Sequence, residues 1–249
     1  MDVAEYHKLA AVEDRMWYFR ALHRHIDAEL SRRLGATPAK VLDAGCGTGG
    51  LITRLAAAHP TWSWTGVDVS DVALAYARER VGALGRKVEI VPGSVTALPF
   101  PAASFDAIVS ADVLYHVEAD ETALGEFARV LRPGGVVVLN VPAYRWLWSY
   151  HDVAVQSCRR YGRRELIAKV SRAGLRMQRA TFWNTLPFPL VVARRKLLPA
   201  PASGSDVRLF PRPIEAAFSG AMALERAWLR VMGRLPFGSS ILAVAVKIH

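Results

Sequence analysis

The chain has 249 residues, of which 52% are hydrophobic and 22% charged, which is sufficient for the core of one large domain. Its two cysteines, Cys46 and Cys158, exclude a disulfide framework and a cysteine-based metal site. The absence of an 18-residue apolar run and of a basic, then apolar leader predicts a cytoplasmic protein without a membrane-spanning helix.

The net charge of +10 is unevenly distributed along the chain. Residues 1–140 contain 14 Lys/Arg and 17 Asp/Glu, a balance of −3, whereas residues 141–249 contain 18 and 5, a balance of +13. A basic half that is rich in aromatic residues predicts contact with an anionic substrate, an anionic membrane surface or nucleic acid. A basic surface that is merely solvated is an equally good interpretation.

A predicted helix over residues 3–35 opens the chain and is followed by an apolar strand at 40–44. The strand leads into the glycine-rich turn 45–50, and a helix is predicted over 49–58. Glycines at 45, 47 and 49 let the backbone approach a ligand where a Cβ would block it. Because the first N–H groups of the helix also face outward, the turn predicts a ligand site.

Two kinds of ligand fit this turn. Gly45, Gly47 and Gly50 match the dinucleotide fingerprint G-x-G-x-x-G, and Asp68 lies near the spacing of its ribose-binding acid. Asp43, just before the first glycine, favours the other kind, because an uncompensated carboxylate there is costly and repels a pyrophosphate. The turn therefore predicts a cationic or amine-bearing ligand.

The rest of the chain alternates between apolar strands and helices, as in a parallel α/β sheet. The predicted strands are 62–68, 88–91, 105–111, 136–141, 175–183 and 241–248. The predicted helices are 71–84, 121–131, 163–173 and 214–233.

Five further motifs follow V-L-D-A-G-C-G-T-G at 41–49, and their order is specific. They are G-V-D-V-S at 66–70, L-P-F at 98–100, S-F-D-A-I-V at 104–109, V-L-Y-H-V at 113–117 and L-R-P-G-G at 131–135. Over roughly residues 40–141 the chain thus resembles the class I S-adenosylmethionine (SAM)-dependent methyltransferases. The resemblance implies a Rossmann-like α/β fold whose seven-stranded sheet is mostly parallel, with an antiparallel last strand.

In that fold, residues 1–38 are expected to form an N-terminal helical cover and 39–183 the SAM-binding α/β core. Residues 184–239 are expected to be a helical insertion, a lid or an interface, and 240–249 the last strand. The insertion contains a Pro/Ser/Gly-rich linker over 199–213. An apolar stripe follows at helical spacing, formed by Ile214, Phe218, Ala221, Trp228 and Met232. Four roles are possible for this stripe: it packs on its own domain, caps a pocket, forms a homodimer surface or contacts a membrane peripherally.

The resemblance also implies SAM as cofactor and S-adenosylhomocysteine as product. Asp68 would accept protons from both ribose hydroxyls, and Ser94 stands where the family often has an aspartate that binds adenine. Arg20 would pair with the cofactor carboxylate, and the Ala111 carbonyl would face its ammonium. The expected cofactor residues are Trp17, Arg20, Asp43, Gly45, Cys46, Gly47, Gly49, Asp68, Val69, Ser94, Val95, Ala111 and Tyr115.

An unusually aromatic segment, P-A-Y-R-W-L-W-S-Y-H-D at 142–152, directly follows a strand end. Together with the R-R-Y at 159–161 it resembles a methyltransferase subset associated with glycan or specialised-metabolite pathways. It predicts a substrate wall in which rings stack, polar tips donate hydrogen bonds and arginines bind an anion. An aromatic plug beneath a lid is the alternative. The wall residues are Tyr144, Trp146, Trp148, His151, Arg159, Arg160 and Tyr161.

The catalytic candidates are His116, His151 and Tyr144, with His116 the first candidate for a general base because its ordinary pKa suits neutral pH. A structural role for His116 is an open alternative, since proximity alone can carry much of a methyl transfer. No carboxylate and histidine cluster has metal-ligand spacing, so no metal is expected.

The predicted function is methyl transfer from SAM to a small-molecule acceptor, by O-methylation of a hydroxyl on an anionic or glycan-like metabolite. The main alternative is a SAM-binding scaffold without turnover. A nucleic-acid methyltransferase is disfavoured, because the chain has Ala-Asp-Val-Leu at 111–114 where such amino-directed enzymes carry Asn-Pro-Pro-Tyr.

Overall fold

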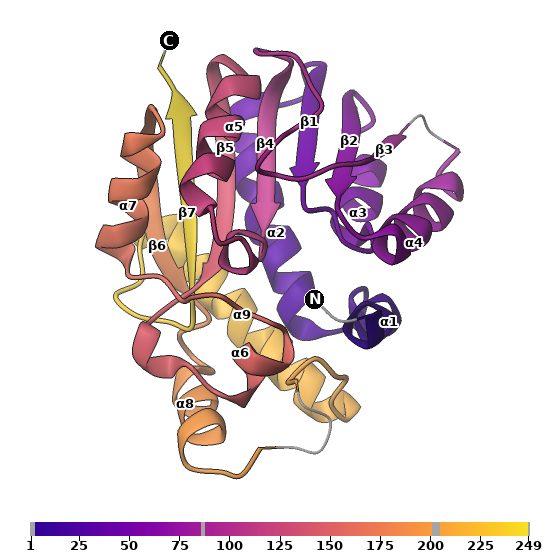
Figure 1. Cartoon of the computed structure of the whole chain (residues 1–249). Coiled ribbons are helices and arrows are strands. Elements are labelled where there is room, and N and C mark those ends of the chain that lie inside the picture. The colour runs from indigo at the N-terminus through magenta and orange to yellow at the C-terminus, as the bar shows by residue number, and fades with distance from the viewer. Residues whose placement is uncertain (1–2, 86–87, 201–204, 249) are drawn as a thin grey trace.

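The computed structural model describes residues 3–85, 88–200 and 205–248. Residues 1–2, 201–204 and 249 of the predicted cover, linker and last strand lie outside this range. A seven-stranded sheet of order β3-β2-β1-β4-β5-β7-β6 forms the centre of the molecule (Figure 1). Its strands are β1 (Ala39–Ala44), β2 (Trp62–Asp68), β3 (Val88–Pro92), β4 (Phe105–Ala111), β5 (Leu131–Pro142), β6 (Leu175–Trp183) and β7 (Ser240–Lys247). Only β7 runs antiparallel to its neighbours, so the predicted class I topology is confirmed.

Helices cover both faces of the sheet, because strand side chains alternate between them. Val41, Ala107 and Val109 pack in one cluster with α2, α3, α4 and α9, and Leu42 and Ile108 in the other with α5 and α7. The helices are α1 (Val3–Val12), α2 (Trp17–Leu34), α3 (Gly50–Ala58), α4 (Asp71–Gly82), α5 (Asp120–Val130), α6 (Tyr150–Ala154), α7 (Arg163–Arg172), α8 (Phe188–Lys196) and α9 (Arg212–Met232), with 3-10 turns η1 (Leu114–His116) and η2 (Arg145–Leu147).

The single helix predicted over residues 3–35 is wrong, because the chain breaks between α1 and α2. Glu13 at the break is buried and accepts hydrogen bonds from the Thr48 hydroxyl and from Arg80, the latter at 3.1 Å. Met16 then adopts an extended conformation (ψ 130°), and α2 begins at the next residue. Drawing this carboxylate into the interior ends the first helix and brings its end to the glycine turn.

The prediction for β5 was also wrong at its start. The helix predicted over 121–131 and the strand predicted from 136 leave Pro133, Gly134 and Gly135 between them, but α5 ends at Val130 and these residues lie within β5. Gly134 has φ +79°, and the pairing register with β4 shifts between Phe105 and Ala107. The two glycines therefore form an irregularity inside the strand.

Helix α9 buries a different face from the predicted apolar stripe. Phe218 and Ala221 pack against the core, whereas Ile214, Trp228 and Met232 are exposed. The fully buried residues are Met222, Glu225 and Leu229. The helix is turned this way because the Glu225 carboxylate accepts the backbone N–H of Leu186 at 2.6 Å, a polar contact that an apolar pattern does not reveal.

A buried histidine on α2 makes the stability of the fold depend on pH. His25 packs against the Trp183 ring at 5.1 Å between centroids, and its Nε2 has no hydrogen-bond partner among the described residues. Burial, with the nearby Arg226 and Arg179, lowers the pKa of His25 to about 4. As pH falls below the ordinary value of 6.5, the unfolded chain takes up a proton that the folded protein refuses, and stability is lost.

We therefore expect His25→Leu to unfold with a free energy close to that of the wild type at pH 7 but to exceed it by roughly 2 kcal/mol at pH 5. Urea unfolding at both pH values measures this difference, and His7→Leu at the exposed His7 is the matched control. A difference that stays constant with pH would contradict the assignment.

Candidate functional site

The glycine turn between β1 and α3 is fixed by backbone hydrogen bonds to β2. The N–H groups of Gly45 and Cys46 both donate to the Val67 carbonyl, at 2.8 and 3.0 Å. Gly45 has φ +87°, and a Cβ on it would overlap the Val113 side chain. Gly49 (φ +79°) plays a different part from the one predicted, because it does not line the cavity described below. A Cβ there would lie 3.0 Å from the Ala77 backbone, so this glycine allows α3 to approach α4.

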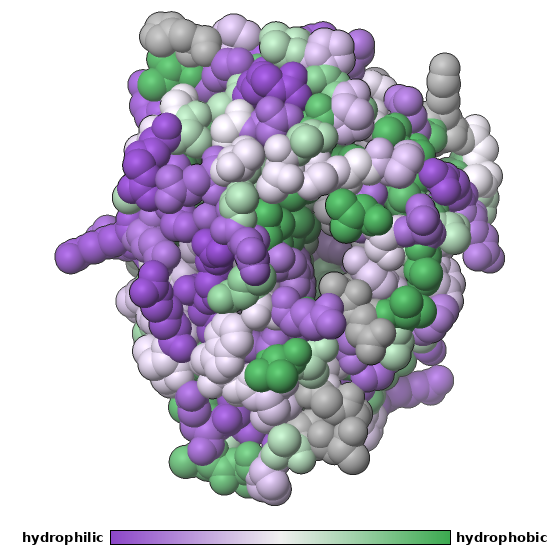
Figure 2. All heavy atoms as spheres, viewed as in Figure 1, coloured by the Kyte–Doolittle hydropathy of each residue, from purple (hydrophilic) through white to green (hydrophobic). Residues whose placement is uncertain are grey.

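A cavity of about 770 Å³ lies beyond the carboxyl ends of the parallel strands, where ligands bind in open α/β sheets. Figure 2 shows its mouth as a hollow near the centre of the view, with apolar side chains at the rim. The predicted residues that line it are Trp17, Asp43, Gly45, Cys46, Gly47, Asp68, Val69, Ser94, Val95, Ala111, Tyr115, His116, His151 and Arg160. Arg20 does not line it, so its predicted pairing with a cofactor carboxylate has no support from the geometry.

Three carboxylates give the end of the cavity at the glycine turn a negative character. Asp43 is 2% exposed, and no described residue donates a hydrogen bond to its side chain or forms an ion pair with it. Burial, with Glu13 and Asp68 nearby, raises the pKa of Asp43 well above its ordinary value. Burial raises the pKa of Glu13 and of Asp68 as well. An uncompensated buried carboxylate of this kind suits a ligand that brings a positive charge.

Asp68, at the end of β2, accepts the N–H groups of Gly47 and Ser70 at 2.9 and 3.0 Å. These bonds hold the carboxylate at the cavity wall. Ser94 also lines the cavity, where its hydroxyl bonds with that of Thr96 at 2.7 Å.

Asp112, a carboxylate that is not among the predicted site residues, follows β4 in the wall of the cavity. Its backbone has φ +57°, an uncommon conformation for a residue other than glycine. Its two oxygens accept hydrogen bonds from Tyr18 Oη at 3.0 Å and Asn140 Nδ2 at 2.8 Å. Burial raises the pKa of Asp112 to about 6, against the lowering effect of these two donors. In the sequence, the one feature that pointed to Asp112 was its position just beyond a central strand.

The two histidines proposed as bases both line the cavity. Burial lowers the pKa of His116 to about 4, and its ring packs on Tyr115 with 4.0 Å between centroids. Burial and Arg195 lower the pKa of His151 to about 3, and its Nδ1 accepts the backbone N–H of Asp206 at 3.1 Å. The neutral His151 ring therefore carries its proton on Nε2, which favours hydrogen-bond donation over proton abstraction.

Most of the predicted aromatic wall does not line the cavity. Tyr144 has φ +62° and stacks on Phe182 with centroids 5.2 Å apart. Trp146 contacts the Phe188 ring of α8 and is 53% exposed, and Trp148 is also exposed. Residues 143 and 161 pair as an isolated bridge, and just beyond it the rings of Tyr144 and Trp146 contact Phe188 at the start of α8. The sequence shows the aromatic composition of the segment but not this direction.

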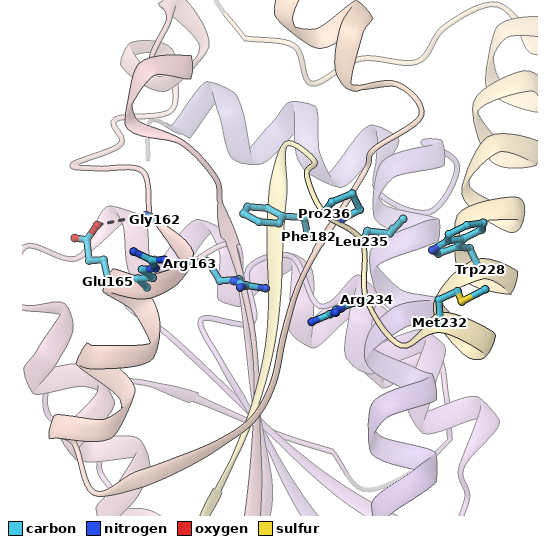
Figure 3. Close-up of a pocket in the computed structure, with 10 residues that line it drawn as sticks. Gly162, Arg163, Glu165, Phe182, Trp228, Met232, Arg234, Leu235 and Pro236 are labelled. Atoms are coloured by element: carbon cyan, nitrogen blue, oxygen red, sulfur yellow. Dashed lines mark hydrogen bonds between the residues drawn. The ribbon is translucent and has the colours of Figure 1, made fainter.

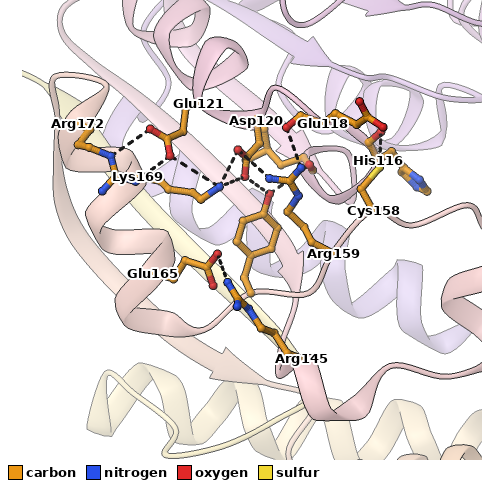
Figure 4. Close-up of polar contacts among 12 residues, drawn as sticks. His116, Glu118, Asp120, Glu121, Arg145, Cys158, Arg159, Glu165, Lys169 and Arg172 are labelled. Atoms are coloured by element: carbon orange, nitrogen blue, oxygen red, sulfur yellow. Dashed lines mark hydrogen bonds and ion pairs between the residues drawn. The ribbon is translucent and has the colours of Figure 1, made fainter.

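Arg159 and Tyr161 do not line the cavity but support its wall, and Figure 4 shows Arg159 beside Asp120 and Glu118. The Tyr161 hydroxyl donates to Asp120 at 2.7 Å, and Arg159 pairs with the same carboxylate at 3.1 Å. Arg159 also donates to the Glu118 carbonyl at 2.8 Å. These contacts fix the chain that carries Tyr115 and His116, because Asp120 and Glu118 follow directly after η1. Neither residue is free to bind an anion.

The other end of the cavity is basic and apolar. Arg160 lines it but is buried and paired with Asp152 at 2.6 Å, so its charge is largely compensated. Arg195 lines it and pairs with Asp206 at 3.0 Å. With Arg194 and Arg208, four arginines line the cavity together with Asp152 and Asp206, and Val155, Leu190 and Val191 add apolar lining. Val207 and Phe210 also line it, where they pack with the cluster that contains Met16 and Trp17.

A second cavity, of about 840 Å³, lies between α7 and α9 (Figure 3). Arg163, Arg164 and Arg234 line it together with Phe182 and Trp228. None of the predicted cofactor residues reaches it. Although it is larger, it lacks the glycine turn and the strand-end carboxylates, so the candidate site is the first cavity. No set of three or more His, Cys, Asp or Glu side chains in the described part of the chain is arranged to hold a metal ion.

Comparisons with known proteins identify the family of the chain. Residues 41–135 match a family model described as a methyltransferase domain. The chain is 31% identical over 242 residues to a malonyl-[acyl-carrier protein] O-methyltransferase of Methylococcus capsulatus, covering 92% of this chain and 84% of that protein. It is 37% identical over 130 residues to a demethylmenaquinone methyltransferase of Thermus thermophilus, and there it spans only about half of the relative's length (56%). Among solved structures, the [4+2]-cyclase SpnF shares the fold, with a TM-score of 0.62 and 20% identity over 90% of this chain and 80% of that one.

Proposed function

This chain belongs to the class I S-adenosylmethionine-dependent methyltransferases, with SAM as the cofactor, and from that premise we propose that it methylates a hydroxyl of an anionic, partly apolar small molecule. The observation that carries the proposal is the opposite charge at the two ends of one cavity. Carboxylates gather at the glycine turn, whereas arginines and apolar side chains gather at the other end. Because a cyclase shares the fold, the fold alone does not fix the reaction, and the residues of the site have to indicate it.

The residues at the acidic end fit the cofactor. Asp43 would hold its amino group, since this buried carboxylate has no partner within the described chain. Asp68 would accept the ribose hydroxyls, and Ser94 and Val95 would border the adenine. Bound there, SAM supplies a methyl group on a sulfonium that is reactive toward nucleophiles. The protein's part is to orient the two reactants and to exclude water.

For a hydroxyl acceptor, we propose Asp112 as the group that takes the proton. It lies at the end of β4, between the two ends of the cavity, and Tyr18 and Asn140 orient its carboxylate. With a pKa of about 6 it is ionised at pH 7 and still basic enough to accept a proton. His116 and His151, with pKa values of about 4 and 3, are weaker bases, so we propose hydrogen-bonding roles for them.

At the basic end we propose that Arg208 and Arg194 meet the anionic group of the acceptor, since neither forms an ion pair among the described residues. Leu190, Val191 and Phe210 would contact its apolar part. These apolar side chains support an amphiphile better than a glycan. The names of the two relatives specify malonyl and demethylmenaquinone acceptors, which agrees with a small chemical group rather than nucleic acid as the target.

The test measures S-adenosylhomocysteine formation with three matched acceptors. They are a long-chain hydroxyphenyl carboxylate, its analogue without the carboxylate and its analogue without the hydroxyl. We expect the first to exceed the second at least tenfold in kcat/KM, about 1.4 kcal/mol for one arginine contact, and the third to be inert. Methyl ester formation from the third would move the acceptor atom to the carboxylate, and no turnover with SAM bound would favour the scaffold alternative.

A further inference from the structure

Helix α8 is the one helix of eight or more residues in the described chain that has no buried residue. It lies at the end of the molecule opposite the C-terminus, where Figure 2 shows apolar side chains at the lower edge (Figures 1 and 2). Five large apolar side chains on or beside it are exposed, and we call them the α8 patch. They are Trp146 (53%), Leu186 (52%), Leu190 (61%), Leu197 (78%) and Leu198 (56%). Such a grouping on a monomer marks a contact surface rather than ordinary scatter.

The charges beside the α8 patch are positive. Arg194, Arg195 and Lys196 occupy the last turn of α8, and Lys196 is exposed. Arg208, on the neighbouring segment, is exposed too. Asp206 offsets Arg195 at 3.0 Å, so three of the four cations have no carboxylate partner among the described residues. A partner for this surface should therefore be apolar and anionic at once.

An anionic lipid surface has that chemistry. Exposed leucine and tryptophan side chains with Lys and Arg beside them are typical of protein surfaces that lie in the membrane interface. Anionic headgroups attract such cations by about 1 kcal/mol each. Helix α8 has nine residues, about 14 Å of helix, which can lie in the interface but not cross it. No helix in the described part of the chain is long and apolar enough to span a bilayer.

The α8 patch is also continuous with the cavity. Leu190 is exposed on one side and lines the cavity on the other, and Pro187, Val191 and Arg194 of the same region line it as well. A molecule that leaves a lipid surface at α8 would therefore meet the basic, apolar end of the cavity first.

We propose that α8 and Trp146 seat the protein on an anionic lipid surface, from which an amphiphilic acceptor enters the cavity past Leu190. The acceptor part of this statement rests on the proposed function, whereas the seating does not. The surface gives the acceptor its route and concentrates it at the cavity mouth.

The test is co-sedimentation of the full chain with vesicles of phosphatidylcholine alone or of an equimolar mixture with phosphatidylglycerol. We expect binding to the anionic vesicles, weakened by salt, and little binding to the neutral ones. Leu197→Glu with Leu198→Glu should reduce the bound fraction at least tenfold, because the variant replaces two exposed apolar side chains by negative charges. Neither residue lines the cavity, so the variant leaves the cavity lining unchanged. Leu224→Glu with Val231→Glu on α9, where the side chains are 67% and 78% exposed, is the matched control and should bind like the wild type.

The outcomes separate the two proposals. Absence of binding to anionic vesicles, or equal binding by the α8 variant, overturns the lipid surface even if a soluble acceptor is methylated. Binding that the α8 variant loses supports the surface even if no acceptor is methylated, in which case only the proposed function fails. A shift from dimer to monomer in light scattering, seen only for the α8 variant and without vesicle binding, would assign the patch to a second copy of the chain.

Discussion

Asp43→Asn should weaken SAM binding on the order of 100-fold, close to 3 kcal/mol, while leaving the free protein at least as stable as the wild type. Both effects have one cause, the buried carboxylate without a partner among the described residues. Its pKa in the folded protein lies above the ordinary value, so its contribution to stability is lost as pH rises through the folded pKa. At pH 8 the folded wild type has therefore lost this contribution to its stability, whereas the asparagine variant, which does not titrate, has not. Calorimetric titration with SAM and thermal unfolding of the free proteins measure the two effects.

The ligand pair that identifies the contact is S-adenosylhomocysteine and its deaminated analogue. The wild type should strongly prefer the former, and Asp43→Asn should bind the two almost equally, because the amino group then has no charged partner. Asp71→Asn, at an exposed aspartate on α4, is the matched control. Unchanged SAM affinity in the Asp43 variant would place the cofactor elsewhere in the cavity, whereas simultaneous loss of stability would show only that the fold is damaged.

The acidic end of the cavity was predictable because its parts are local in sequence. Asp43 and Asp68 lie at the carboxyl ends of two parallel strands. The strand 105–111 was predicted with its observed bounds because it is largely buried and apolar, and the strand 62–68 because apolar and polar residues alternate at its start. The class I topology followed from their order. Where the chain departs from regular geometry the prediction failed, as at Gly134 and Gly135 inside β5.

The basic end was not predictable in the same way, because distant segments assemble it. Asp206 reaches His151 across 55 positions, and between the two ends of the cavity Tyr18 reaches Asp112 across 94. Tyr144 and Trp146 were placed in the wall on composition alone, but the positive φ of Tyr144 directs the segment toward α8. Composition reports which side chains are present, and only tertiary contacts decide where they point.

Asp112→Asn should lower kcat by about 10²- to 10⁴-fold, the usual contribution of a general base, with SAM affinity within a few-fold of the wild type. Asparagine tolerates the left-handed backbone at this position, so the variant should fold. The pH profile gives the decisive reading. The wild-type kcat/KM should rise with pH through about 6 and then level off, since only the ionised carboxylate accepts a proton, and the variant should lack this limb.

Two neighbouring variants distinguish a base at Asp112 from a merely structural carboxylate. The Tyr18 hydroxyl lowers the pKa of Asp112, so Tyr18→Phe should move the rising limb to higher pH without removing it. His116→Asn should keep the limb near 6, because burial holds the pKa of His116 at about 4, far from that limb. A limb that persists in Asp112→Asn but disappears in His116→Asn would make His116 the base. Since carboxylate and imidazole line the same cavity, the position of the limb assigns the proton where the loss of activity alone would not.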